Sequence, residues 1–214
     1  MPQRPPWPAA TLATPLLALA LQGCAAPMTA SNANATYPPP GHFPPTMNRL
    51  VDGPFRFWRH SLGVYCFRTW GCSVQYGAET VWEEPSDERQ RPLEERPPGM
   101  RNRMRGTQGS FRNFEGPLVA NWRDDKKHPH RLELDLAKIF ADGLIRHNVP
   151  NDEIAPQYSV GDPSIVVEIN DRTVRLYMRA LIPLKKPRDP NNRLTDSVDD
   201  LVLVHEQTMP GASS

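Results

Sequence analysis

Alternating hydrophobic and polar positions recur in short runs through the second half of this chain, each bounded by glycine, proline, asparagine or aspartate. A period of two predicts β-strands, because successive side chains of a strand point to opposite faces. The clearest runs are 164–169 and 173–182, separated by Asn170-Asp171. An Asn-Asp pair suits a tight reversal, so this stretch predicts a β-hairpin.

The side chains of this predicted hairpin divide into an apolar face and a charged face. The apolar residues that share one side are Val167, Ile169, Val174, Leu176, Met178 and Ala180, and the charged residues opposite are Glu168, Arg175 and Arg179. We expect the charged face to be wet. An ion pair between Glu168 and an arginine of the other strand would there contribute only about 0.3 kcal/mol.

Two further pairs of strands follow from the same pattern. Residues 64–69 and 72–76 alternate around a tight turn near Trp70, and 118–122 and 131–136 alternate around a polar turn. Asp135 can cap a short helix from Leu136 to Ala141, and 201–204 supplies a closing strand. The expected fold class is α+β, mainly antiparallel β built from hairpins, with one or two short helices and long polar loops.

The N-terminus carries a different signal. An apolar run from Ala9 to Leu21 leads into Leu21-Gln22-Gly23-Cys24, which resembles the processing site of a bacterial lipoprotein signal peptide. The run is about a dozen residues, shorter than the roughly 20 of a spanning helix. We expect residues 1–23 to be removed, the alternative being an unprocessed apolar tail.

The lipoprotein resemblance implies a membrane anchor at Cys24. Its sulfur would carry diacylglycerol and its amine a third acyl chain such as palmitate, and several chains together make anchoring effectively permanent. Ala25 and Ala26 follow without an acid, which in the enterobacterial sorting rule implies the outer membrane, facing the periplasm. Residues 24–54 are rich in proline and lack apolar periodicity, so we expect a tether. A single domain over 55–207 and a disordered tail over 208–214 complete the expected organisation.

Charge and cysteine usage refine this picture. Removal of residues 1–23 takes away one of 25 basic residues and no acid, so 24 basic residues remain against 24 acidic ones. Net charge therefore gives no reason to expect a nucleic-acid partner. Besides Cys24 the chain has only Cys66 and Cys72, which in an oxidising compartment predict a disulfide that clamps the 64–76 hairpin. Two free buried thiols are the alternative. Two cysteines alone do not complete a zinc site, so we expect no metal.

Residues 78–110 are the longest polar stretch. An acidic block from Glu79 to Glu95 precedes a basic block that ends in Arg101, Arg103 and Arg105, and prolines punctuate both. This pattern predicts a long loop, either a solvated insertion or a surface that steers a charged partner. Trp70 is either folded onto the edge of the core or a contact residue.

The sequence contains no nucleophile elbow, His-Glu-x-x-His, P-loop or glycine-rich dinucleotide turn. His128-Pro129-His130 and His147 near Asp152 and Glu153 are the nearest approaches to a metal or general-base cluster. Neither pattern identifies a site, so we expect no catalytic residues, no cofactor and no enzyme activity.

Several short stretches resemble uncharacterised proteobacterial lipoproteins, some of which are similar to immunity lipoproteins found beside type VI secretion lipase effectors. These stretches are 57–60, 65–72, 113–114, 121–122, 139–140, 144–150 and 170–174. The resemblance implies a stoichiometric, non-catalytic inhibitor of a phospholipase toxin, with contacts expected at Trp70, Arg101, Arg103 and Arg105. A structural accessory of an envelope or secretion complex and a small periplasmic hydrolase are the alternatives.

Overall fold

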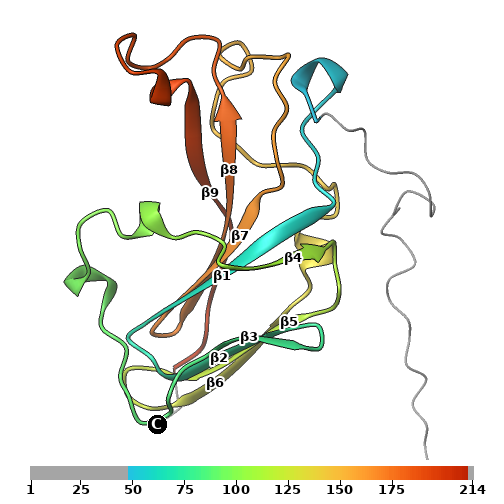
Figure 1. Ribbon diagram of the computed structural model, residues 1–214. Coiled ribbons are helices and arrows are strands. Elements are labelled where there is room, and N and C mark those ends of the chain that lie inside the picture. The colour runs from blue at the N-terminus through green and yellow to red at the C-terminus, as the bar shows by residue number, and fades with distance from the viewer. Residues whose placement is uncertain (1–47, 212–214) are drawn as a thin grey trace, which may run out of the picture. The chain divides into compact units, whose positions relative to one another are not determined.

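The computed structural model describes residues 48–211, which form two β-sheets with one short helix and several 3-10 turns (Figure 1). The predicted fold class is confirmed. The strands are β1 (Arg59–Phe67), β2 (Trp70–Tyr76), β3 (Glu79–Glu83), β4 (Gln108–Arg112), β5 (Leu118–Arg123), β6 (Pro129–Leu134), β7 (Ser164–Asn170), β8 (Thr173–Pro183) and β9 (Ser197–Thr208). The helix is α1 (Leu136–Ile139), and the 3-10 turns are η1 (Leu50–Asp52), η2 (Leu93–Glu95), η3 (Arg101–Arg103) and η4 (Arg193–Thr195).

The strands pair in two separate groups. One sheet has the order β4-β1-β7-β8-β9, and the other has the order β3-β2-β5-β6. All pairs are antiparallel except β1 with β7, which run parallel. The parallel pair places the first strand beside a strand that follows about a hundred residues later, so the five-stranded sheet is closed by a non-local contact.

The two hairpins with clear turn signals form as predicted. β7 and β8 pair from Ser164 with Arg179 to Asn170 with Thr173, around Asp171 in the left-handed region (φ 56°). β5 and β6 pair through the polar turn. The predicted cap also forms, because the Asp135 side chain accepts from the main-chain N–H groups of Ala137 and Lys138. α1 ends at Ile139, two residues before the predicted end.

The third predicted hairpin is wrong. β1 and β2 are both strands, but β1 pairs with β4 and β7 while β2 pairs with β3 and β5. The chain therefore changes sheets at Arg68 (φ 54°) and Thr69. The predicted Cys66–Cys72 disulfide is present, and it joins the two sheets instead of clamping a hairpin. Alternation along the sequence identifies a strand and its faces but not its partner.

Replacing both Cys66 and Cys72 by alanine is expected to lower the free energy of unfolding by about 2 kcal/mol. The closed loop is short, so in the chain-entropy description its constraint on the unfolded state is modest. Urea unfolding of the double variant against the oxidised parent measures the difference. A fully unfolded double variant would instead mean that the link between the sheets is required for folding.

The main core lies between the two sheets. It is built from alternate residues of the strands that face each other. The five-stranded sheet contributes Leu62 and Val64 of β1, Val167 and Ile169 of β7, and Leu176 and Met178 of β8. The four-stranded sheet contributes Val74, Tyr76, Leu118, Ala120, Trp122, Leu132 and Leu134. Aromatic residues that flank β1, among them Phe55 and Phe57, complete it. The predicted apolar face of the β7–β8 hairpin is therefore buried here.

The predicted wet face of that hairpin is also covered. Residues 84–107, called the strap below, leave β3, pass through η2 and η3, and return to β4 (green in Figure 1). Met104 of the strap packs with Phe67, Val166 and Tyr177 in a second apolar cluster on the outer face of the five-stranded sheet. Glu168 and Arg179 are buried there. The predicted wet face is thus wrong, because the polar loop of 78–110 contributes a third layer.

Three predicted boundaries differ from the structure. β3 and β4 occupy the two ends of the predicted 78–110 loop. Residues 48–54, assigned to the tether, contact the domain, because the Asn48 side chain donates to the carbonyls of Arg56 and Val160. β9 continues to Thr208, the first residue of the predicted tail. The predicted signal peptide, Cys24 and residues 25–47 lie outside the described residues, as do 212–214. Between residues 48 and 211, no helix has the length and hydropathy needed to cross a bilayer.

Candidate functional site

The strap is held to the five-stranded sheet by a buried carboxylate. Glu168 in β7 accepts two hydrogen bonds from Arg101, Nε at 2.7 Å and Nη2 at 2.9 Å, and one from Arg175 Nη1 at 3.0 Å. The Tyr177 hydroxyl donates to it at 3.2 Å. Burial, together with the charge of Glu168, raises the pKa of Tyr177 to about 12. This network occupies the guanidinium of Arg101, which sequence reasoning had placed on a partner surface.

A second buried charge fixes the end of the strap. Arg179 Nη1 donates to the carbonyl oxygens of Asn102, at 2.9 Å, and Met104, at 3.0 Å, and its Nη2 pairs with Asp199 of β9. Arg105 pairs with the same carboxylate at 3.1 Å, yet its side chain is 65% exposed. One nitrogen of the Arg105 guanidinium is therefore paired with Asp199, and most of the side chain remains exposed to solvent.

Arg103 differs from its two neighbours. Its side chain is exposed, and the described part of the chain offers its guanidinium no ion pair or hydrogen bond. The backbone beside it is nevertheless fixed, because Thr107 N–H donates to the Leu62 carbonyl at 3.0 Å and the Tyr65 hydroxyl bonds Arg105 N and O. We call Arg103 and Arg105, presented on this anchored backbone, the strap surface.

Trp70 lies elsewhere. It begins β2 in the four-stranded sheet, half-buried, with the Lys127 ammonium 4.2 Å from the ring centroid. Next to it, Asp125 pairs with Arg68 at 3.1 Å and with Arg89 at 2.5 Å. The Trp70 ring therefore contacts the β5–β6 turn, and its main chain pairs with Arg89 near the start of the strap. Arg101 and Arg105, by contrast, pair with Glu168 of β7 and Asp199 of β9. The structure does not bring the four predicted contact residues into one constellation.

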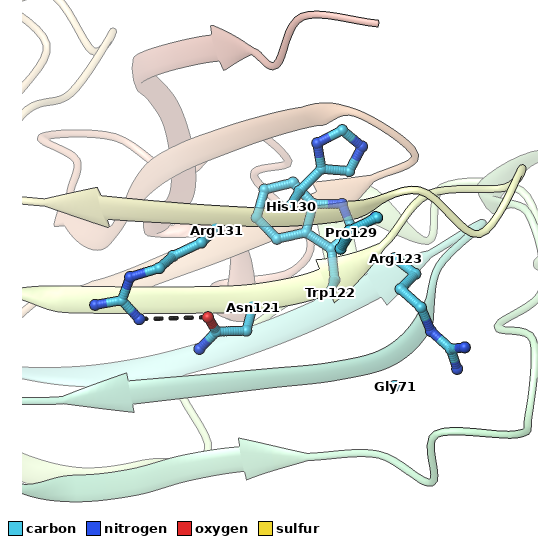
Figure 2. Close-up of a pocket in the computed structure, with 7 residues that line it drawn as sticks. All are labelled: Gly71, Asn121, Trp122, Arg123, Pro129, His130 and Arg131. Atoms are coloured by element: carbon cyan, nitrogen blue, oxygen red, sulfur yellow. Dashed lines mark hydrogen bonds between the residues drawn. The ribbon is translucent and has the colours of Figure 1, made fainter. Parts of the chain in front are cut away.

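A shallow hollow lies at one end of the four-stranded sheet, lined by residues of β2, β5 and β6 (Figure 2). Its volume is about 390 Å³, and it is lined by Gly71, Asn121, Trp122, Arg123, Pro129, His130 and Arg131. Arg131 Nη1 donates to Asn121 Oδ1 at 3.3 Å, and Arg123 donates to the Ser86 carbonyl. Both arginines thus already have protein partners. Sequence reasoning missed this hollow, since the only signal is the missing side chain at Gly71.

The histidines singled out in the sequence have structural partners. Asp124 Oδ2 lies 3.2 Å from His128 Nδ1 and 3.1 Å from His130 Nε2, and Oδ1 accepts from two N–H groups of the turn. Although burial opposes it, these hydrogen bonds lower the pKa of Asp124. His147 Nδ1 bonds the Val149 carbonyl at 2.9 Å. Within residues 48–211, no serine, threonine or cysteine is hydrogen bonded to any of the three, so a nucleophile–base pair is not assembled there.

Glu84 lies against the disulfide, with one carboxylate oxygen within 4.8 Å of the Cys66 and Cys72 sulfurs. The two sulfurs are bonded to each other, so they do not offer thiolates to a metal. Burial raises the pKa of Glu84 to about 7. The residue is therefore largely protonated below neutral pH in the folded protein.

Glu84→Gln is expected to be more stable than the parent at pH 8, with a difference that shrinks towards pH 5. The folded parent holds the proton up to about pH 7, whereas the unfolded chain releases it near 4.5, so the contribution of Glu84 is present at low pH and lost as pH rises through 7. Urea unfolding at both pH values tests this, with the exposed Glu83→Gln as the matched control. A difference independent of pH would contradict it.

In comparisons with known proteins, no protein-family model, curated protein or solved structure matches the chain.

Proposed function

We propose that this chain is a non-catalytic, stoichiometric binding protein for a protein partner, held at the outer membrane by lipid on Cys24. The specific form implied by the resemblance of its sequence is an immunity protein that inhibits a type VI secretion lipase effector. The observation that carries the proposal is the strap surface, where Arg103 and Arg105 stand in solvent on a backbone fixed by internal hydrogen bonds.

An ordered basic surface supports a protein partner for a physical reason. A binding loop that is already fixed loses little conformational entropy on association, so more of the contact energy remains as affinity. Exposed arginines pair with carboxylates in planar, two-bond geometry and steer an acidic partner towards the site. The partner surface that fits is therefore acidic.

The histidines support the same class of function. His128, His130 and His147 each have an internal partner, and none of the three is hydrogen bonded to a hydroxyl nucleophile among the described residues. A hydrolase would need such a pair, or a bound metal, within reach of substrate. The hollow near Gly71 is open and flanked by arginines that already bond neighbouring groups, which suits it less well to holding a small substrate.

The test is a pull-down of the full chain, tagged at its C-terminus, from detergent-solubilised envelopes of a strain that makes it. We expect a lipase-like protein in near-equal amount, and inhibition of its lipase activity by the purified chain. Recovery of only envelope-assembly proteins, without lipase inhibition, would replace the proposal by a structural role.

Charge reversal then tests the surface. Arg103→Glu with Arg105→Glu should weaken capture at least tenfold, equivalent to about 1.4 kcal/mol, because repulsion replaces attraction. Arg188→Glu, at an exposed arginine outside the strap, is the matched control. Equal capture by both variants would place the partner on another surface, and Arg131→Glu would test the hollow.

A further inference from the structure

β9 forms an open edge of the five-stranded sheet. It runs from Ser197 to Thr208, the longest strand among the described residues, and β8 is its only partner there. No other main-chain hydrogen bond reaches it from within residues 48–211. In an antiparallel ladder the main-chain groups alternate in direction, so about half of the N–H and C=O groups of β9 point away from the sheet.

This edge has only part of the usual protection: β9 carries a bulge at Val204 and the charges of Asp199, Asp200 and Glu206, but it has no lysine or proline and its centre is uncharged. Natural edge strands are short, or carry lysine, proline or charges that disfavour further pairing. β3 and β4 are short, and β6 begins with Pro129 and carries Arg131 and Glu133. The centre of β9, Leu201 to Val204, holds four apolar residues, with Leu203 49% exposed. A strand of this kind is a template for another strand.

The sequence of β9 is complementary to itself. His205 pairs with Leu176 of β8 and Leu203 with Tyr177, so Val204 is an extra residue in a bulge. If the unpaired bulge residue Val204 is not counted, five residues of the strand lie on each side of Val202. Antiparallel pairing of two copies through this point sets Leu201 opposite Leu203, Asp200 opposite His205, Asp199 opposite Glu206, Val198 opposite Gln207 and Ser197 opposite Thr208.

The faces and charges agree with this register. Asp200 pairs with Ala180 and His205 with Leu176, both residues of the inner face of β8, so an acid and an imidazole share one face. Asp200 already accepts hydrogen bonds from the main-chain N–H and the side-chain amide of Asn148 in its own chain. The like charges Asp199 and Glu206 are already compensated within each copy, by Arg179 and Arg105 and by Arg175 respectively.

We propose that β9 pairs antiparallel with β9 of a second copy around a two-fold axis at Val202, which joins the five-stranded sheets of both copies into one. The contact is isologous, so it closes at two copies and does not propagate. It does not rest on the proposed function, because the open edge of β9 and the strap surface are separate features of the fold.

Cross-linking at the axis tests the register. Residues on a two-fold axis between antiparallel strands have Cα atoms about 4.5–5.5 Å apart, within reach of a disulfide. Val202→Cys in the full chain should therefore give a covalent dimer on mild oxidation. Leu203→Cys should not, because it faces Leu201, and its counterpart lies about 7–8 Å away on the diagonal. The chain without an added cysteine controls for Cys24.

Mass measurement gives the second readout. Light scattering of the purified full chain should report a dimer, and Leu203→Lys should convert it to a monomer with an unchanged circular dichroism spectrum. Leu181→Lys, at a residue 59% exposed on β8 but away from the edge, should leave the dimer intact. A native chain of monomer mass without a Val202→Cys product, or equal cross-linking at 202 and 203, would overturn the proposal.

Discussion

Replacing Gly63 by alanine is expected to lower the free energy of unfolding by about 3 kcal/mol, the upper part of the range for overpacking a tight site. A Cβ atom at Gly63 would lie 2.0 Å from the carbonyl oxygen of Arg105 and 2.8 Å from its carbonyl carbon. Both are main-chain atoms of the strap, which is bonded to β1 two residues later through the Thr107 N–H and the Leu62 carbonyl. The methyl group therefore forces the strap away from the sheet, which also weakens the packing of Met104.

Gly161→Ala is the matched control for this substitution, because no atom lies within 4 Å of a Cβ built at Gly161. Urea unfolding of the two variants separates the steric effect from the general consequence of replacing glycine. If both variants unfold at the same urea concentration, the strap does not lie against β1 as described.

Glu168→Gln is expected to lower the free energy of unfolding by about 3–5 kcal/mol, as for removal of one partner from a buried ion pair. The carboxylate is fully buried and accepts from two guanidinium groups and one hydroxyl. An amide has one acceptor oxygen, and its NH₂ group faces donors. The glutamine variant therefore leaves Arg101 and Arg175 poorly paired at the base of the strap.

Arg101→Met should cost less than Glu168→Gln, because Arg175 still compensates the carboxylate and the Arg101 side chain is 41% exposed. Thermal unfolding of both variants gives the order of the two effects. A larger loss in the arginine variant would mean that the strap is held mainly by Arg101 packing and not by the buried charge.

The features predicted correctly from sequence are those specified by residues close together in the chain. β7 and β8 alternate on both sides of Asn170-Asp171, and Asp135 lies immediately before the helix that it caps. The disulfide was also predicted, because Cys66 and Cys72 are the pair that remains once Cys24 is assigned to lipid.

The features that sequence reasoning missed depend on distant partners. Nothing in 64–76 distinguishes a hairpin from two strands that belong to different sheets. The strap packs on the sheet through isolated apolar residues such as Met104. Isolated apolar residues do not form the periodic hydrophobic pattern from which a buried segment is predicted. The sequence therefore places Glu168 in solvent, although the predicted cross-strand pairing with an arginine is correct, and the structure identifies that arginine as Arg175.

The candidate site was only partly accessible for the same reason. The basic block identified Arg101, Arg103 and Arg105 as a group, but charge counts do not show which guanidinium has an internal partner. Arg101 is committed to Glu168, and Trp70 is covered by Lys127 of the β5–β6 turn. Arg103 and Arg105 are the members that the fold leaves available.

The parallel pairing of β1 with β7 sets the stage of synthesis at which the domain can fold. β1 ends at Phe67, whereas its neighbour begins only at Ser164. Contacts between residues so distant in sequence stabilise the fold only after a long loop has closed, and closing that loop costs conformational entropy. A nascent chain that has released β1 to β6 holds every strand of the four-stranded sheet but lacks the centre of the five-stranded sheet. The core between the two sheets can therefore close only after β7 and β8 have been synthesised.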